Sequence, residues 1–131
     1  MQYLLLVYID PTLIEALPEG EYDTMMRHCL QHADELQAEG TLLGFQQLEP
    51  ASTAKAVRRR EGKVAVVDGP FAETKELLAG FNLVEADSLE HAIALAEQLP
   101  WARTGCIEVR ALRDVGAVRR RVGLAASPPA A

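Results

Sequence analysis

The chain has 131 residues, of which 13 are basic and 19 acidic, giving a formal net charge of −6, and 49% are hydrophobic. This length predicts one domain with its own core. An acidic chain is a poor ligand for nucleic acid or anionic membranes, and no apolar run approaches the ~18 residues of a membrane span. We expect a cytoplasmic protein without a signal peptide, because no basic residue precedes the apolar residues 3–9.

Apolar periodicity predicts six strands. A β-type run over residues 2–9 predicts a strand buried on both faces, and Asp10 with Pro11 breaks it. The other strands are expected at residues 41–48, 54–59, 63–67, 79–86 and 105–112. The third and fourth strands form a hairpin, because Gly62 can adopt the left-handed backbone of a tight turn.

Two helices are predicted between these strands. Apolar residues recur at helical spacing over 21–39, with Gly40 as the C-cap, and over 89–99, with Asp87 or Ser88 as the N-cap. The order β-α-β, hairpin, β-α-β predicts an α+β fold with two helices on one face of an antiparallel sheet.

Two helices cover one face, yet the strand over 2–9 is apolar on both: Leu4 and Leu6 alternate with Leu5 and Val7. An apolar patch of this size is seldom left in water. We therefore expect the second face to be covered by the same face of a second subunit, in an isologous homodimer.

Composition separates a domain from a tail. Residues 114–131 end in small residues and prolines, which cannot build a core, so we expect a flexible tail after a folded domain of residues 1–113. Residues 55–63 hold five basic residues and one acidic, in an otherwise acidic domain. Such a run is usually a solvated turn.

No metal or cofactor is predicted. His28, His32 and Glu35 lie on one side of a predicted helix, a spacing that can ligate zinc, but no fourth ligand is defined. Cys29 and Cys106 belong to no CxxC motif, so we expect two free thiols in a reducing compartment.

The most distinctive segment, residues 68–76, reads DGPFAETKE. Asp68 before a Gly-Pro turn can accept hydrogen bonds from that turn, which is a structural role. A rigid turn followed by several acidic and basic residues also suits a polar site held over a sheet. The residues alone leave both interpretations open.

This nonapeptide resembles the signature of the DGPF branch of the YCII-related family. The resemblance covers residues 1–113 and includes residues 3–8, 39–44, 48–50 and 107–110. It implies a ferredoxin-like α+β subunit that dimerises through its sheet into an α/β barrel.

At the site that the resemblance implies, this sequence differs from the pattern of the related proteins. Related proteins carry a proposed acid/base pair, a His on the first helix with a nearby Asp, and one relative eliminates chloride from a lactone. Here Cys29 occupies the position of that His, with His28 beside it and His32 one turn further.

Two functions therefore compete. The first is lyase or hydrolase chemistry on a small molecule, in a pocket between the sheet and the first helix. His32 would be the base, because imidazole titrates near neutral pH, and Asp68 would orient it. The expected binding residues are Cys29, Phe71, Glu73, Thr74, Lys75 and Glu76.

The second function is a non-catalytic homodimeric module that binds a small-molecule ligand or a protein through residues 68–76. The partner would be a sigma-factor-type regulator, because many members of the family are encoded beside extracytoplasmic-function sigma factors. Nucleic-acid contact by the basic hairpin is a third candidate, which the acidic surroundings disfavour.

Overall fold

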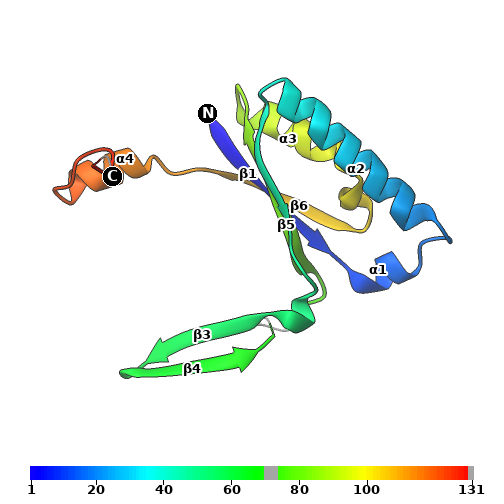
Figure 1. Ribbon diagram of the computed structural model, residues 1–131, viewed down its shortest axis with the longest axis horizontal. Helices are drawn as coiled ribbons and strands as arrows, with labels where there is room; N and C mark the ends of the chain where they lie inside the picture. Colours follow the sequence, from blue (N-terminus) through cyan, green and yellow to red (C-terminus); the bar gives the residue numbers. More distant parts are fainter. Residues whose placement is uncertain (70–73, 130–131) are drawn as a thin grey trace.

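The computed structural model describes residues 1–69 and 74–129, and its centre is a four-stranded antiparallel sheet (Figure 1). Across the sheet the strands follow the order β2 (Leu42–Gln47), β5 (Leu77–Glu85), β1 (Gln2–Ile9) and β6 (Gly105–Ala111). Every neighbouring pair is antiparallel. The predicted α+β fold with an antiparallel sheet is confirmed.

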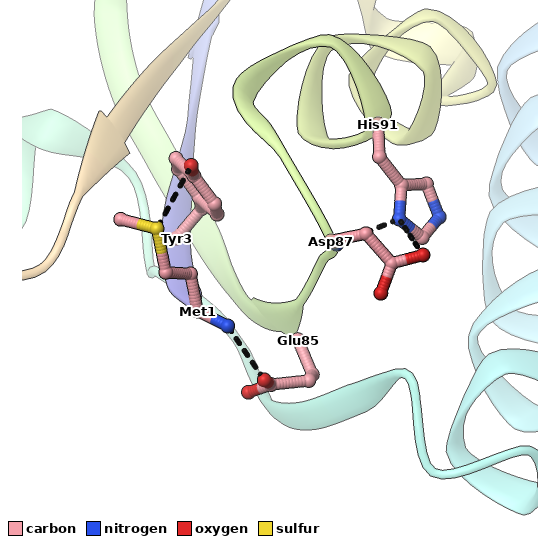
Figure 2. A network of polar contacts seen from close by, with 5 residues as sticks. All are labelled: Met1, Tyr3, Glu85, Asp87 and His91. Atoms are coloured by element: carbon pink, nitrogen blue, oxygen red, sulfur yellow. Dashed lines mark hydrogen bonds and ion pairs between the residues drawn. The ribbon is translucent and has the colours of Figure 1, made fainter.

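Helices α2 (Glu21–Ala38) and α3 (Leu89–Glu97) lie on the same side of this sheet (Figure 1). Ser88, one of the two predicted caps, begins α3: its hydroxyl accepts a hydrogen bond from the His91 amide at 3.1 Å. Asp87 instead donates its backbone N–H to His91 Nδ1 at 3.0 Å (Figure 2).

The core lies between these helices and the sheet. Every second residue of β1, namely Tyr3, Leu5 and Val7, is buried toward the helices, because successive side chains of a strand point to opposite faces of the sheet. Trp101, in the 3-10 helix η2 (Pro100–Arg103), donates its indole N–H to Cys29 Sγ at 3.3 Å. This contact joins η2 to the apolar face of α2.

Polar contacts hold the start of β1 against the end of β5. The Met1 amine lies 2.7 Å from Glu85 Oε1, and the Tyr3 hydroxyl contacts Met1 Sδ at 3.7 Å (Figure 2). These contacts extend the register in which Gln2 faces Glu85.

A short helix, α1 (Pro11–Glu15), follows β1 where a simple break was predicted. Asp10 is its N-cap, and Pro11 occupies the first turn, where a missing N–H costs nothing. The residues that end the strand therefore also start a helix.

Strands β3 (Lys55–Arg60) and β4 (Lys63–Asp68) form the predicted hairpin as a separate two-stranded sheet, preceded by the 3-10 helix η1 (Ala51–Thr53). Its turn has positive φ at Glu61 (51°) and Gly62 (77°), which matches the right-handed twist of the strands. The hairpin projects away from the helices (Figure 1), and all six residues of β4 are exposed.

The segment expected to be a flexible tail contains helix α4 (Val115–Arg121). Asp114 caps it by accepting a hydrogen bond from the Ala117 amide at 3.0 Å. This helix also lies away from the sheet (Figure 1). Over the part of the chain that the structure describes, no helix has the length and apolarity to cross a membrane.

Candidate functional site

On the sheet face opposite the helices, the two central strands β1 and β5 carry an apolar patch, and Glu108 and Arg110 of β6 lie beside it. Leu4 faces Leu83 and Leu6 faces Phe81 across the β1–β5 pair, so these four side chains share that face. All four are half-buried, and α2 and α3 lie on the other side of the sheet (Figure 1).

At the end of this face lies a polar hollow of about 590 Å³. It is lined by Tyr8, Asp10, Leu13, Thr74, Lys75, Glu76, Cys106 and Glu108. Three segments that are distant in sequence meet here: the end of β1 with the start of α1, the residues before β5, and the first half of β6.

Asp10 is the most buried polar residue of the hollow, at 3% exposure. One of its carboxylate oxygens accepts hydrogen bonds from the Thr12 amide at 2.9 Å and the Thr12 hydroxyl at 2.7 Å. The other lies 3.6 Å from Lys75 Nζ. The hydrogen bond from the Thr12 hydroxyl lowers the pKa of Asp10 most, and the Thr12 amide and Lys75 lower it further. Together they outweigh burial, which raises it, so Asp10 is ionised near neutral pH.

The opposite wall of the hollow is acidic. Tyr8 donates its hydroxyl to Glu108 Oε1 at 3.3 Å, and burial together with the Glu108 charge raises the pKa of Tyr8. Burial, followed by the charges of Glu76 and Glu108, also raises the pKa of the Cys106 thiol. Cys106 is therefore a neutral thiol at pH 7.

The hollow combines one exposed cation, Lys75, with carboxylates that differ in their surroundings. Asp10 is buried and hydrogen-bonded, whereas Glu76 is half-buried and Glu108 is exposed. Such a set can hold an anionic oxygen on the ammonium group while a carboxylate accepts a proton.

The predicted site residues fall into several places. Thr74, Lys75 and Glu76 line the polar hollow together. Phe71 and Glu73, also predicted as binding residues, lie outside the described residues. Cys29 lines a different hollow, between α2 and the sheet.

No described contact joins the predicted acid/base pair. His32, on α2, has Nδ1 3.9 Å from Glu35 Oε2, and within residues 1–69 and 74–129 its buried Nε2 has no hydrogen-bond partner. Asp68, at the end of β4, is ion-paired with Lys55 on the hairpin. Neither His32 nor Asp68 lines the polar hollow or the hollow beneath α2.

The histidines of α2 do not complete a metal site. His28 and His32 stack with ring centroids 6.2 Å apart. Among the described residues, no group of three His, Cys, Asp or Glu side chains could hold a metal ion.

Sequence reasoning missed Asp10, Tyr8, Cys106 and Glu108. A signal was present for Asp10, because it continues the alternation of Leu4, Leu6 and Tyr8 and so belongs to the face away from the helices. The meeting of Cys106 with Tyr8 depends on the β1–β6 register, which one sequence does not contain.

Fold and hollow together define an α+β protein whose antiparallel sheet is covered by helices on one side and carries a polar hollow on the other. The chain belongs to the YCII-related domain family, whose model matches residues 1–115. It is 37% identical over 114 residues to "Uncharacterized protein R00369" of Rhizobium meliloti (strain 1021), covering 86% of this chain and 92% of that protein.

A solved structure shares the fold. It is the 5-chloro-2-hydroxyhydroquinone dehydrochlorinase (TftG) from Burkholderia phenoliruptrix AC1100, in complex with 2,5-dihydroxybenzoquinone. The TM-score is 0.52 at 16% sequence identity, over 86% of this chain and 94% of the other. At this identity the similarity extends to the fold alone.

Proposed function

We propose that the chain is a ferredoxin-like subunit of a homodimeric α/β barrel, and that its polar hollow performs acid/base chemistry of a lyase or hydrolase type on a small molecule. The observation that carries the proposal is the buried, ionised Asp10 beside the exposed ammonium of Lys75. Asp10 Oδ1 caps α1 by accepting from Thr12, whereas Oδ2 faces Lys75, so the carboxylate has a partner beyond its capping role.

The residues of the hollow suggest separate roles. Asp10 is a weak base because its pKa is lowered, so its charge would position Lys75 rather than take a proton. Lys75 would stabilise the negative charge that develops on a substrate oxygen. The base would then be Glu76 or Glu108, whose carboxylates both line the hollow.

Elimination fits this arrangement. A carboxylate takes the proton from a carbon next to a carbonyl, and the electrons of that C–H bond form an enolate whose oxygen faces Lys75. The carbonyl then re-forms, a C=C bond forms to the neighbouring carbon, and the bond from that carbon to the leaving group breaks, so that the group departs as an anion. The solved structure that shares the fold is named a dehydrochlorinase of 5-chloro-2-hydroxyhydroquinone, and dehydrochlorination is an elimination. This similarity of chemistry supports the proposal, although the two proteins are only 16% identical.

The dimer is supported by the apolar face. A monomer in water would leave Leu4, Leu6, Phe81 and Leu83 without a covering layer from α2 or α3. An isologous partner would cover them and close the polar hollow beside them.

A non-catalytic module, binding a small ligand or a sigma-factor-type regulator, remains the second candidate. The observation that favours it is the burial of Cys29, which raises the pKa of its thiol. If Cys29 replaces a catalytic His, the position has lost its acid/base function.

Turnover and ligand binding distinguish the two candidates. The purified protein is screened by thermal shift and by chromatography of products against 2,5-dihydroxybenzoquinone, chlorinated hydroquinones, small lactones and carboxylates. A saturating ligand at 100 times its Kd adds ~2.7 kcal/mol of stability. Turnover supports the enzyme, whereas a thermal shift without product supports the module.

Matched variants locate the site. Lys75→Ala should abolish turnover or the thermal shift, whereas Lys55→Ala removes a lysine that is also ion-paired to an aspartate but lies on the hairpin. Equal loss in both variants, or in neither, contradicts the assignment.

Light scattering tests the dimer. At micromolar concentration it should give about twice the 14.3 kDa chain mass, and a monomer at that concentration overturns the barrel.

A further inference from the structure

The hairpin of β3 and β4 is a sheet of its own, and it projects away from the helices (Figure 1). All six residues of β4 are exposed, and the valines of the hairpin are among the most exposed apolar side chains: Val57 at 68%, Val66 at 62% and Val64 at 51%. A two-stranded hairpin alone is only marginally stable in water and gains stability when further strands extend it. We therefore expect another chain to extend this hairpin.

The two edges of the hairpin differ in charge. Strand β3 carries Lys55 and the arginines 58–60, and basic side chains on an edge strand oppose pairing with another strand. Strand β4 reads KVAVVD, so its only charges are Lys63 and Asp68, at its two ends and of opposite sign. Two copies of β3 side by side would bring like charges together, which is destabilising, whereas two copies of β4 would not. The edge suited to a second copy is therefore that of β4.

The backbone of β4 presents hydrogen-bonding groups at this edge. The Gly69 amide donates to the Ala54 carbonyl at 2.6 Å, so Gly69 bonds toward β3. Successive residues of an antiparallel strand direct their N–H and C=O groups to opposite sides. Counted back from Gly69, every second residue therefore bonds to β3, whereas Val64, Val66 and Asp68 direct their N–H and C=O groups outward. These are the groups that a further strand would bind.

Symmetry limits how two copies of β4 can pair. A two-fold axis perpendicular to the sheet makes the strands antiparallel, and residues directly opposite each other must share a face, so one residue lies opposite its own copy. With Val66 at the axis, Val64 lies opposite the partner's Asp68, and every outward-directed residue of β4 is paired. An axis at Ala65 or Val67 would leave Asp68 or Val64 opposite a residue outside the strand. The register centred on Val66 is therefore favoured.

We propose that β4 pairs with β4 of a second copy across a two-fold axis at Val66, so that the two hairpins form one continuous antiparallel sheet. Val57 faces Val66 within each hairpin, so the pairing joins the valines of both copies into one row across the sheet. Cross-strand pairs of β-branched side chains stabilise a sheet. The basic strand β3 then forms both outer edges, where its charge opposes further strand addition. This contact is separate from the proposed barrel, which uses the four-stranded sheet.

Disulfide cross-linking tests the register. In the full chain, Cys106→Ser removes the exposed thiol, and Val66→Cys is added. Opposed hydrogen-bonded residues have Cα atoms about 5.5 Å apart, which a disulfide spans. Mild oxidation at micromolar concentration should therefore give a covalent dimer ~10-fold or more faster than with Val64→Cys, which lies on the same face but about 14 Å from its own copy. Equal rates at both positions, or a faster reaction at Val64, overturn the proposal.

Amide hydrogen exchange tests the pairing without cysteines. In the wild-type chain the Val64 and Val66 amides should exchange ~10-fold or more slowly than in Val66→Lys, which places like charges opposite each other at the axis. Val57→Lys adds the same charge to β3, away from the axis, and should keep the protection. Wild-type Val64 and Val66 amides that exchange as fast as those of Val66→Lys overturn the proposal. A chain with twice the monomer mass but no cross-link at Val66 would support the barrel and overturn the pairing of β4.

Discussion

Lys75 Nζ lies 3.6 Å from Asp10 Oδ2, and the two side chains differ widely in exposure, at 80% and 4%. Because the lysine is exposed, solvent screens the pair and its contribution to stability is small. The ion pair instead fixes the position of Lys75, because it holds the ammonium group beside the sheet face that the helices leave open. Asp10 in turn is fixed by Thr12 and by its own backbone N–H, which donates to the Thr104 carbonyl at 2.7 Å.

The acid stability of the fold should depend on Asp10. Its pKa is lowered in the folded protein, first by the Thr12 hydroxyl, from an ordinary value of about 3.9. As the pH falls, the unfolded chain takes up this proton before the folded protein does. Asp10 therefore stabilises the fold fully above about pH 4, and this contribution is lost as the pH falls through the lower folded pKa.

Urea unfolding of wild type and Asp10→Asn between about pH 2 and about pH 6 measures this effect. Asparagine keeps the capping acceptor, so the variant should fold but lose stability less steeply in acid. Asp34→Asn, at an exposed position of α2, serves as the control. Parallel curves for wild type and Asp10→Asn would contradict the assignment of the shift.

Gly105 should not tolerate a side chain. A Cβ built there would lie 1.9 Å from the Tyr8 carbonyl oxygen and 2.8 Å from Ile9 Cα, both backbone atoms of β1. Gly105→Ala must therefore separate β6 from β1 and should cost about 2 to 4 kcal/mol in the free energy of unfolding. It should also disturb the polar hollow, whose residue Cys106 is next in the chain.

Gly44→Ala is the matched control, because its Cβ would meet Leu83 Cβ at an ordinary 3.6 Å. Its cost should stay within about 1 kcal/mol. Chemical denaturation of both variants makes the comparison, and equal costs would show that β6 can move away from β1 without a penalty.

Alkylating agents should react slowly with Cys106, and the negative charge of Glu76 should be one cause. Burial raises the pKa of this thiol most, and the charges of Glu76 and Glu108 raise it further. Since the thiolate is the reactive form, Glu76→Gln should lower the pKa and accelerate reaction with iodoacetamide a few-fold at neutral pH. Peptide mass spectrometry separates Cys106 from the buried Cys29, and Glu90→Gln on α3 should leave the rate unchanged.

Local signals explain what could be predicted of the fold. Helix α2 ends before Gly40, and Ser88 caps α3, so turn and cap chemistry placed both helices correctly. The short helix α1 was missed because Asp10 and Pro11 are equally good at ending a strand and at starting a helix. One local sequence pattern then has two structural outcomes.

The site was less predictable, because it is assembled across the sheet. Lys75 and Glu76 stood out as a charged cluster next to a turn, and both line the polar hollow. Their neighbours Asp10 and Cys106 come from opposite ends of the chain and are joined by the β1–β6 register.

His32 provides the last prediction, because its buried Nε2 has no partner among the described residues. An unpaired buried nitrogen costs free energy, and leucine also has the higher helix propensity. His32→Leu should therefore raise the free energy of unfolding by about 1 kcal/mol. The exposed His28→Leu, one turn earlier on α2, should stay within about 0.5 kcal/mol of wild type. A His32→Leu variant less stable than wild type would mean that the ring makes a favourable contact.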